Sequence, residues 1–272
     1  MTGKDLSAAM RRGGRIYGTL VVSSSPQWPA AVQGTGVDFV FIDTEHIPMD
    51  RAALSWMCRT YAAAGIPPLV RIPSPNPLAA CQTLDSGACG IIAPYVETAA
   101  QVQQLAGAVK LRPLKGERAA QALDDADSLG SAARHYLEVF NSGNMLIVNI
   151  ESVPAIDNLG EILTVPGLDA VLIGPHDLSV SLGIPEQYQD PVFDKTVRGI
   201  IKRARAHGVA AGIHFWESVE LELEWAKAGA NLILHSGDIT LFEKALRSDL
   251  AKMREALGDG ITRFGSEVST TV

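Results

Sequence analysis

Short apolar runs recur along the chain, and most of them are continuous rather than alternating. A continuous apolar run is typical of a parallel strand that is covered on both faces. Segments in which apolar residues have helical spacing separate these runs. The predicted strands cover residues 16–22, 39–43, 69–72, 90–94, 145–150, 170–173, 209–214 and 231–235.

The segments between the strands carry two signs of helices. Apolar residues recur at helical spacing in 99–105 and 221–227, and triplets such as Ala-Gly-Ala stand just before strands, where helix C-caps are expected. Eight alternations of strand and helix predict an α/β fold, a single-domain (β/α)8 TIM barrel. An open doubly wound sheet is the alternative. We expect the barrel to span 1–258 and residues 259–272 to form a disordered tail.

One predicted connection is unusually long. More than thirty residues separate the helix that ends near Leu111 from the strand that begins at Met145. Connections inside compact domains are ordinarily far shorter, and long ones often carry function. We therefore expect this segment to form a lid or a contact between subunits.

Length and charge narrow the class of protein. The 272 residues fit one barrel, since such barrels run to about 250 residues. The net charge is −7, and no basic cluster follows one face, which argues against a nucleic-acid partner. No apolar run approaches the roughly 20 residues that span a bilayer, and the N-terminus lacks the apolar core of a signal peptide. We expect a cytoplasmic protein with no membrane association.

Polar side chains gather at the predicted carboxyl ends of the strands, where α/β barrels keep their active sites. Glu151 and Asp177 end neighbouring strands, and two such acids could seat a hard divalent cation. The other members are Asp43, Glu45, His46, Arg71, His176, His214 and His235. Convergence of these residues on one face points to a metal-dependent enzyme.

Each residue also has a structural alternative. Glu151 could be a surface acid before a helix capped by Ser152, and Asp177 could itself cap the next helix. His214 and His235 suit the wall of the site better than metal binding.

Two absences from the sequence exclude particular kinds of chemistry. No lysine stands at a predicted strand end, which argues against a Schiff-base aldolase, and no phosphate-binding GxxxxGK[ST] loop is present.

The segment 39–46, which reads FVFIDTEH, resembles the IDxEH motif of the HpcH/HpaI aldolase family, the class II, metal-dependent pyruvate aldolases. The family's later signatures follow in order at 70–71, 84–88, 150–152 and 173–179, so the resemblance covers most of the chain. It implies a (β/α)8 barrel and a homo-oligomer, commonly a hexamer built as a trimer of dimers, in which the last helix is exchanged between subunits. It also implies a small-molecule 2-oxo acid and an aldehyde as substrates.

The resemblance assigns a role to each matching acid and to the histidine of the first motif. Glu151 and Asp177 correspond to the two metal ligands, which hold Mg²⁺, Mn²⁺ or Co²⁺ together with waters and the 2-oxo acid. His46 corresponds to the catalytic base. Asp43 would orient His46, and Asp85, from a neighbouring subunit, would raise its basicity.

The resemblance also implies how the 2-oxo acid is bound. Arg71 corresponds to the residue that stabilises the enolate oxygen. Backbone N–H groups around Gly174, His176 and Asp177 would hold the carboxylate. Many relatives carry a glutamine at the position of Asn149, whose shorter side chain would lose the contact to the keto oxygen or make it through water.

Two further departures surround the aldehyde side rather than the metal. The family's glycine-rich arginine loop is represented only by 115–120, which reads KGERAA, and the segment after the seventh strand, 214–216, reads HFW.

Three functions are consistent with the sequence and with the resemblance. The first is a lyase that cleaves a 4-hydroxy-2-oxo acid to pyruvate, or a related oxo acid, and an aldehyde. The second is a citrate-synthase-like condensation or a CoA-thioester lyase, with Arg112, Lys115 and Arg118 near the phosphates. The third is a barrel that binds an oxo acid without turning it over.

Overall fold

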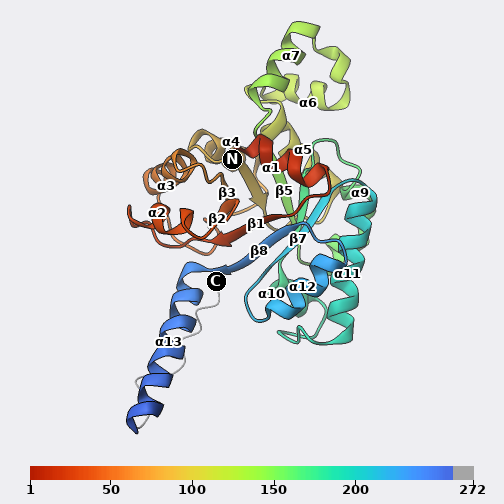
Figure 1. The fold of residues 1–272 in the computed structure, drawn as a ribbon. Coiled ribbons are helices and arrows are strands. Elements are labelled where there is room, and N and C mark those ends of the chain that lie inside the picture. The colour runs from red at the N-terminus through yellow and green to blue at the C-terminus, as the bar shows by residue number, and fades with distance from the viewer. Residues whose placement is uncertain (260–272) are drawn as a thin grey trace.

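The computed structural model describes residues 1–259, in which eight parallel strands close into a barrel (Figure 1). Each strand pairs with the next along the chain, and β8 pairs with β1. This arrangement confirms the predicted TIM barrel and excludes the open sheet. The strands are β1 (Ile16–Leu20), β2 (Phe39–Asp43), β3 (Pro68–Arg71), β4 (Gly90–Ala93), β5 (Met145–Ile150), β6 (Ala170–Ile173), β7 (Ala210–Phe215) and β8 (Leu232–Gly237). Residues 260–272, most of the predicted tail, lie outside the described residues.

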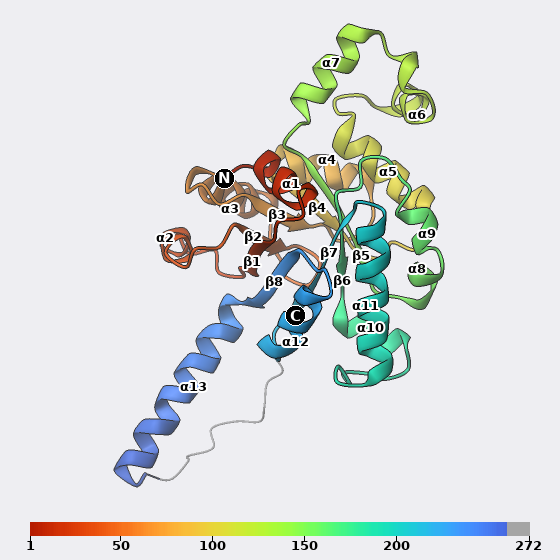
Figure 2. The ribbon, with the colours of Figure 1, turned by 45° about the vertical axis from the view of Figure 1, so that its right-hand side comes forward.

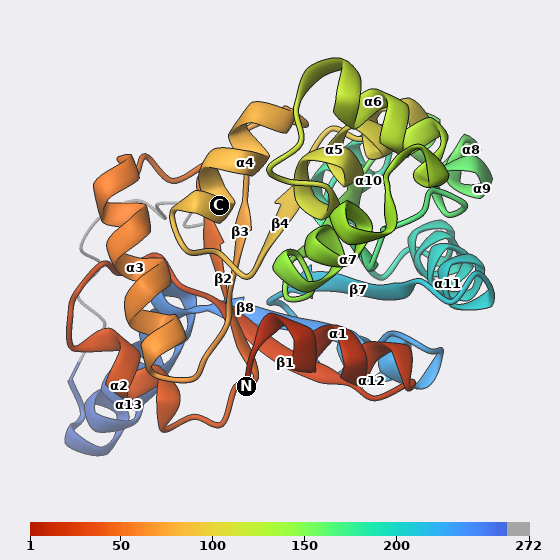
Figure 3. The ribbon, with the colours of Figure 1, turned by 90° about the horizontal axis from the view of Figure 1, so that it is seen from above.

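Helices lie between successive strands and surround them, as the view along the barrel shows for α3, α4, α5 and α11 (Figure 3). Their starts follow ordinary capping chemistry. Asn76 caps α4 ahead of Pro77, and Thr98 and Gln101 form a capping box on α5. The helices are α1 (Gly3–Arg11), α2 (Trp28–Gln33), α3 (Arg51–Ala63), α4 (Pro77–Asp85), α5 (Ala99–Lys110), α6 (Gly116–Asp124), α7 (Ser131–Phe140), α8 (Val153–Asp157), α9 (Leu159–Ile162), α10 (Pro175–Ser181), α11 (Pro191–Ala206), α12 (Val219–Lys227) and α13 (Asp238–Leu257), with a short 3-10 helix at Ala126–Ser128.

Side chains from alternate strand positions fill the barrel interior. Phe39, Leu69 and Met145 belong to this inner cluster and are fully buried. Gly18 is needed on β1, because a Cβ there would lie 2.3 Å from the ring of Phe39. Helix α1 closes the end of the barrel where the strands begin, through buried Leu6, which packs into the same cluster. Chemistry is therefore left to the opposite, carboxyl end of the strands.

The long connection between β4 and β5 contains α5, α6, the 3-10 helix and α7. Helices α6 and α7 extend from the end of the barrel where the strands begin (Figures 1 and 2). They pack on their own small apolar cluster, which includes Ala122, Leu129 and Leu137. The segment is thus not a lid over the strand ends of its own chain. A subunit contact remains a prediction.

Helix α13 leaves the barrel instead of packing across β8 and β1 (Figures 1 and 2). Only its first residue, Asp238, is buried, and its carboxylate accepts hydrogen bonds from the N–H groups of Val22 (3.0 Å) and Ser23 (2.9 Å). These bonds fix the point from which the helix departs. Beyond it the helix exposes apolar side chains that a barrel helix would normally bury: Ile239, Phe242, Leu246, Leu250, Met253 and Leu257.

Candidate active site

A cavity of about 450 Å³ opens at the carboxyl ends of the strands. Residues from β2, β3, β5, β6 and β7, with the loops that follow, line this cavity. The lining residues are Phe41, His46, Arg71, Asn149, Leu172, Ile173, Gly174, Pro175, His176, Asp177, Glu186, His214 and Trp216. Six of the predicted site residues are therefore brought together: His46, Arg71, Asn149, Gly174, His176 and Asp177.

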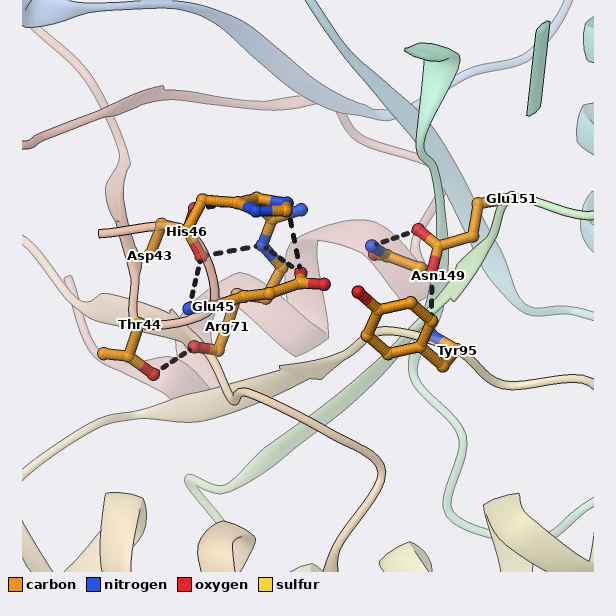
Figure 4. Close-up of polar contacts among 8 residues, drawn as sticks. All are labelled: Asp43, Thr44, Glu45, His46, Arg71, Tyr95, Asn149 and Glu151. Atoms are coloured by element: carbon orange, nitrogen blue, oxygen red, sulfur yellow. Dashed lines mark hydrogen bonds and ion pairs between the residues drawn. The ribbon is translucent and has the colours of Figure 1, made fainter. Parts of the chain in front are cut away.

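Arg71 lies at the centre of the charged groups. Its Nε and Nη2 donate to the two oxygens of Asp43 at 2.8 and 2.5 Å, and its Nε lies 3.1 Å from Glu45 Oε2. Burial alone would raise the pKa of Asp43, but the hydrogen bonds and charge of Arg71 lower it. The guanidinium also lies over the ring of Phe41, 5.5 Å from its centroid. Arg71 is thus a fixed cation at the end of β3 (Figure 4).

The loop after β2 carries the histidine of the IDxEH motif. Thr44 donates from its hydroxyl to the carbonyl of Arg71 (2.6 Å), and Glu45 N–H donates to Asp43 (2.9 Å), so the loop is held across the end of β3. His46 Nε2 lies 3.7 Å from Glu45 Oε2. The resemblance implied that Asp43 orients His46. In the structure the Asp43 carboxylate is hydrogen-bonded to Arg71, and Glu45 is the acid beside the imidazole of His46 (Figure 4).

Glu151 is buried, which rejects its interpretation as a surface acid although Ser152 does cap α8. Its carboxylate accepts from the N–H of Tyr95 (2.7 Å) and from Asn149 Nδ2 (2.9 Å). Burial raises the pKa of Glu151, and the charges of Asp177 and Glu45 raise it further. The charged form of Glu151 is therefore destabilised until a cation approaches.

The β6 end supplies the second predicted metal ligand. Asp177 stands in the first turn of α10, is exposed, and is not the cap, because Gly174 occupies that position. A Cβ at residue 174 would lie 2.8 Å from Glu151 Oε2, so glycine is required for the loop to approach this carboxylate. The start of α10 and the end of β5 are thereby packed against one another.

The donor set fits a hard divalent cation. Glu151 and Asp177 offer carboxylate oxygens, which suit Mg²⁺, Mn²⁺ or Co²⁺. Asn149 Oδ1 is buried and has no partner among the described residues. Within the same part of the chain, no group of three or more His, Cys, Asp or Glu side chains is placed to hold a metal. A cation held by two acids would keep positions open for water and substrate.

Backbone strain is concentrated around this site. Among the described residues, the non-glycine residues with positive φ are Tyr95 (54°), Glu186 (58°) and Ser236 (52°). All three follow or end a strand on the carboxyl side or lie in the loop after α10. Such conformations persist where surrounding contacts hold them, often at functional sites. Tyr95 uses its conformation to present its N–H to Glu151.

Tyr95 was not among the predicted site residues, and Glu45 was named at a strand end without a role. The phenol of Tyr95 points toward Glu45 (Figure 4), and a hydrogen bond to Glu45 is the main reason why the Tyr95 pKa is raised to about 12. Tyr95 therefore joins the β2 and β5 sides of the site. The IDxEH motif already contained the signal for Glu45. No sequence pattern singled out Tyr95, although it follows the fourth strand.

The two histidines of the last strands point in different directions. His214 lines the cavity, its Nε2 lies 3.0 Å from the carbonyl oxygen of Ser236, and burial lowers its pKa to about 4. His235 is instead turned outward, 2.7 Å from Glu222 on α12. His214 pairs in register with Leu234, so His235 stands one position further along β8 and faces the other side of the sheet. The prediction that His235 belongs to the site wall was wrong.

Asp85 is far from the cavity within one chain. It ends α4, at the end of the barrel where the strands begin, and pairs with Arg112. Arg118 lies on α6 and donates to Gln121 (2.6 Å) and to the carbonyl of Ser128 (2.9 Å). A role for Asp85 thus requires a neighbouring subunit. The basic residues considered for CoA phosphates are likewise remote from the cavity of their own chain.

Comparisons with known proteins agree with this geometry. A family model described as HpcH/HpaI aldolase/citrate lyase matches residues 17–245. The chain is 34% identical over 249 residues to a 2-keto-3-deoxy-L-rhamnonate aldolase of Shigella sonnei, which covers 89% of this chain and 91% of that protein. A protein of the same name from Escherichia coli K12 is 34% identical over 250 residues.

Solved structures show the same fold. An HpcH/HpaI aldolase/citrate lyase family protein from Burkholderia cenocepacia J2315 matches with a TM-score of 0.78 and 28% identity, over 92% of this chain and 99% of that one. The citrate synthase SbnG matches with a TM-score of 0.79 and 29% identity, over 93% of this chain and 99% of that one. The similarity thus extends over almost the whole barrel.

Proposed function

The chain belongs to the HpcH/HpaI aldolase/citrate lyase family, whose members include divalent-metal-dependent aldolases, and we propose that it cleaves or forms 4-hydroxy-2-oxo acids through a pyruvate enolate. One observation carries the proposal. The buried Glu151, whose pKa is raised by burial and by Asp177 and Glu45, accepts a hydrogen bond from Asn149 and lies against Gly174, and these two residues line one cavity with Arg71 and His46. This arrangement combines two carboxylates that could bind a cation, a fixed guanidinium and an imidazole that can accept a proton.

The metal would be held by Glu151 and Asp177. When bound, a divalent cation supplies Lewis acidity that stabilises negative charge on the oxygen of a 2-oxo acid. Gly174 allows the loop after β6 to lie against Glu151, and the free N–H groups around Gly174, His176 and Asp177 would bind the carboxylate of the oxo acid. Mg²⁺, Mn²⁺ and Co²⁺ all suit these ligands.

In the cleavage direction His46 takes the proton of the C4 hydroxyl, the C3–C4 bond breaks, and an aldehyde leaves. The electron pair of that bond passes into the enolate of pyruvate, and a proton returned to C3 completes the reaction. Arg71 stabilises the developing enolate charge. Asp43 holds Arg71 in place, and Glu45 lies beside His46. Asp85 of a neighbouring subunit would act on the same base.

The oligomer expected from the family has a physical basis in this chain. The apolar stripe of α13 repeats at spacings of three and four residues and is exposed from Ile239 to Leu257. A cavity of about 460 Å³ lies beside β1, β8 and α12, and its lining includes Tyr17, Leu223 and Ile233. We propose that α13 of a second copy covers this groove, and that the assembly is a hexamer.

Pyruvate release tests the proposed reaction directly. Protein stripped with a chelator should release no pyruvate from 2-keto-3-deoxy-L-rhamnonate or from simpler 4-hydroxy-2-oxo acids, and Mg²⁺, Mn²⁺ or Co²⁺ should restore it. Asp177→Asn should fold, bind metal more weakly and lose turnover. Activity that is unaffected by the chelator, or equal in Asp177→Asn, would contradict the metal assignment.

A citrate-synthase-like condensation is the second candidate, because the chain matches the citrate synthase SbnG at 29% identity. The two reactions share an enolate but differ in the electrophile. Incubation with oxaloacetate and acetyl-CoA, followed by measurement of free thiol, would decide between them. The higher identity to 2-keto-3-deoxy-L-rhamnonate aldolases, 34% against 29%, favours the aldolase.

A further inference from the structure

We propose that the cavity wall formed by His176, Glu186 and Trp216 selects a neutral, hydroxylated aldehyde over an aldehyde that carries a carboxylate. This inference rests on the proposed aldolase function and names the class of its second substrate. It is argued from the charge of the cavity, from the way in which Glu186 is held, and from the aromatic surface that faces it.

The charge of the cavity is unfavourable to a second anion. Of the lining residues in the described part of the chain, Arg71 is the only lysine or arginine, and Asp43 and Glu45 already neutralise it. The lining also contains Asp177 and Glu186. Once the carboxylate of pyruvate is bound, an aldehyde with its own carboxylate would meet acids and find no unpaired lysine or arginine among the described lining residues.

Glu186 is held in position by the neighbouring helix. Its backbone is left-handed (φ 58°), an uncommon state for a non-glycine residue, and its N–H donates to Ser179 Oγ at 2.9 Å. The hydroxyl of Ser179, which is fully buried, donates in turn to the carbonyl of His176 at 2.7 Å. Ser179 therefore ties the backbones of both wall residues to α10.

The side chains of this wall can bind hydroxyl groups. His176 Nδ1 and Glu186 Oε1 lie 3.5 Å apart, and both side chains are about half exposed to the cavity mouth. A carboxylate accepts hydrogen bonds from hydroxyl groups, and an imidazole can donate or accept.

Trp216 supplies the apolar part of the wall. Its ring packs against other aromatic rings, with centroids 5.7 Å from His214, 6.1 Å from Phe215 and 6.5 Å from Tyr188. These contacts fix the indole at the cavity without burying it completely. An indole face opposite hydrogen-bonding groups suits a short carbon chain that carries hydroxyl groups.

Two matched pairs of aldehydes test the inference in the wild-type protein with pyruvate and Mn²⁺. Butanal and succinic semialdehyde have four carbons and differ by the carboxylate; lactaldehyde and propanal have three and differ by the hydroxyl. We expect kcat/KM to be at least about tenfold higher for butanal than for succinic semialdehyde, and higher for lactaldehyde than for propanal. A preference for succinic semialdehyde would overturn the inference.

Exchange of the methyl protons of pyruvate with solvent, measured without any aldehyde, separates this failure from failure of the proposed function. If no exchange occurs and no aldehyde is used, the aldolase function is wrong. If exchange occurs and the anionic aldehyde is preferred, only the acceptor class is wrong.

Variants of the loop after α10 test the role of Glu186. Glu186→Gln keeps the size of an exposed side chain and should shift the butanal to succinic semialdehyde ratio about tenfold toward the anion; Glu186→Lys should shift it further. Gln187→Lys adds the same unit of charge as Glu186→Gln, but Gln187 is not a lining residue. Its ratio should stay near that of the wild type. Equal shifts in Glu186→Gln and Gln187→Lys, or no shift in either, would contradict the role of Glu186.

Discussion

Arg71 contributes both to the electrostatics of the site and to stability, because its guanidinium pairs with Asp43 and Glu45 and lies over the ring of Phe41. Arg71→Ala should lower kcat by about two orders of magnitude through loss of a preorganised charge. It should also destabilise the fold by about 3–5 kcal/mol, because Asp43 stays fully buried without its cation. Steady-state kinetics and urea unfolding measure both effects. A change in KM alone would place Arg71 in substrate binding instead.

His214 should make stability depend on pH. Its pKa is lowered to about 4 by burial, whereas an unfolded histidine titrates near 6.5. Between these values only the unfolded chain binds the proton, so the free energy of unfolding rises with pH and this contribution is complete above about 6.5. From pH 7.5 to pH 5 the wild type should lose about 2 kcal/mol more than His214→Gln.

Urea unfolding at the two pH values measures this difference, and a control comes from another histidine. His207, at the end of α11, is exposed, and His207→Gln should keep the pH dependence of the wild type. Identical pH dependence in the wild type and His214→Gln would contradict the assignment.

Sequence reasoning located most residues of the site because strand ends can be read from apolar runs. Arg71 lies near the end of a predicted strand, and Glu151 and Asp177 follow two others, so topology alone brings them to one face. The side-chain contacts of these residues were harder to predict. Asp43 pairs with Arg71 rather than with His46, and His235 faces outward, because these outcomes depend on side-chain direction and local turns.

At the scale of elements, the strands of the barrel were predictable from the sequence, whereas the helices that extend away from the barrel were not. The predicted boundaries of β2, β5 and β6 are confirmed to the residue. The pattern of α13 is that of any amphipathic helix, and nothing in it says that the helix leaves its own barrel. The same holds for α6 and α7, whose helical segments were missed within a long polar connection.

The apolar stripe of α13 leads to a prediction about assembly. Leu246→Asp places a charge on the stripe and should convert the oligomer to smaller species, as measured by light scattering after size-exclusion chromatography. Ser248→Asp introduces the same residue on the same helix, but off the stripe, and should leave the mass unchanged. A monomeric wild type, or equal effects of both variants, would contradict a role of α13 in assembly.

At the scale of the whole molecule, the apolar residues that stabilise the barrel and the polar residues of the candidate site lie at opposite ends. Helix α1 and the inner apolar cluster close one end, while the acids, Arg71 and His46 occupy the other. No helix within residues 1–259 is long and apolar enough to cross a membrane. The closed topology was predictable because eight strand–helix units leave few alternatives.

The most direct measurement of the central claim is deuterium exchange into the methyl group of pyruvate, followed by proton NMR. Chelator-treated protein should show no exchange, and Mg²⁺, Mn²⁺ or Co²⁺ should restore it in the wild type but not in Glu151→Gln. This result would establish a metal-dependent pyruvate enolate formed at Glu151. Exchange that persists without metal, or in Glu151→Gln at the wild-type rate, would contradict the account.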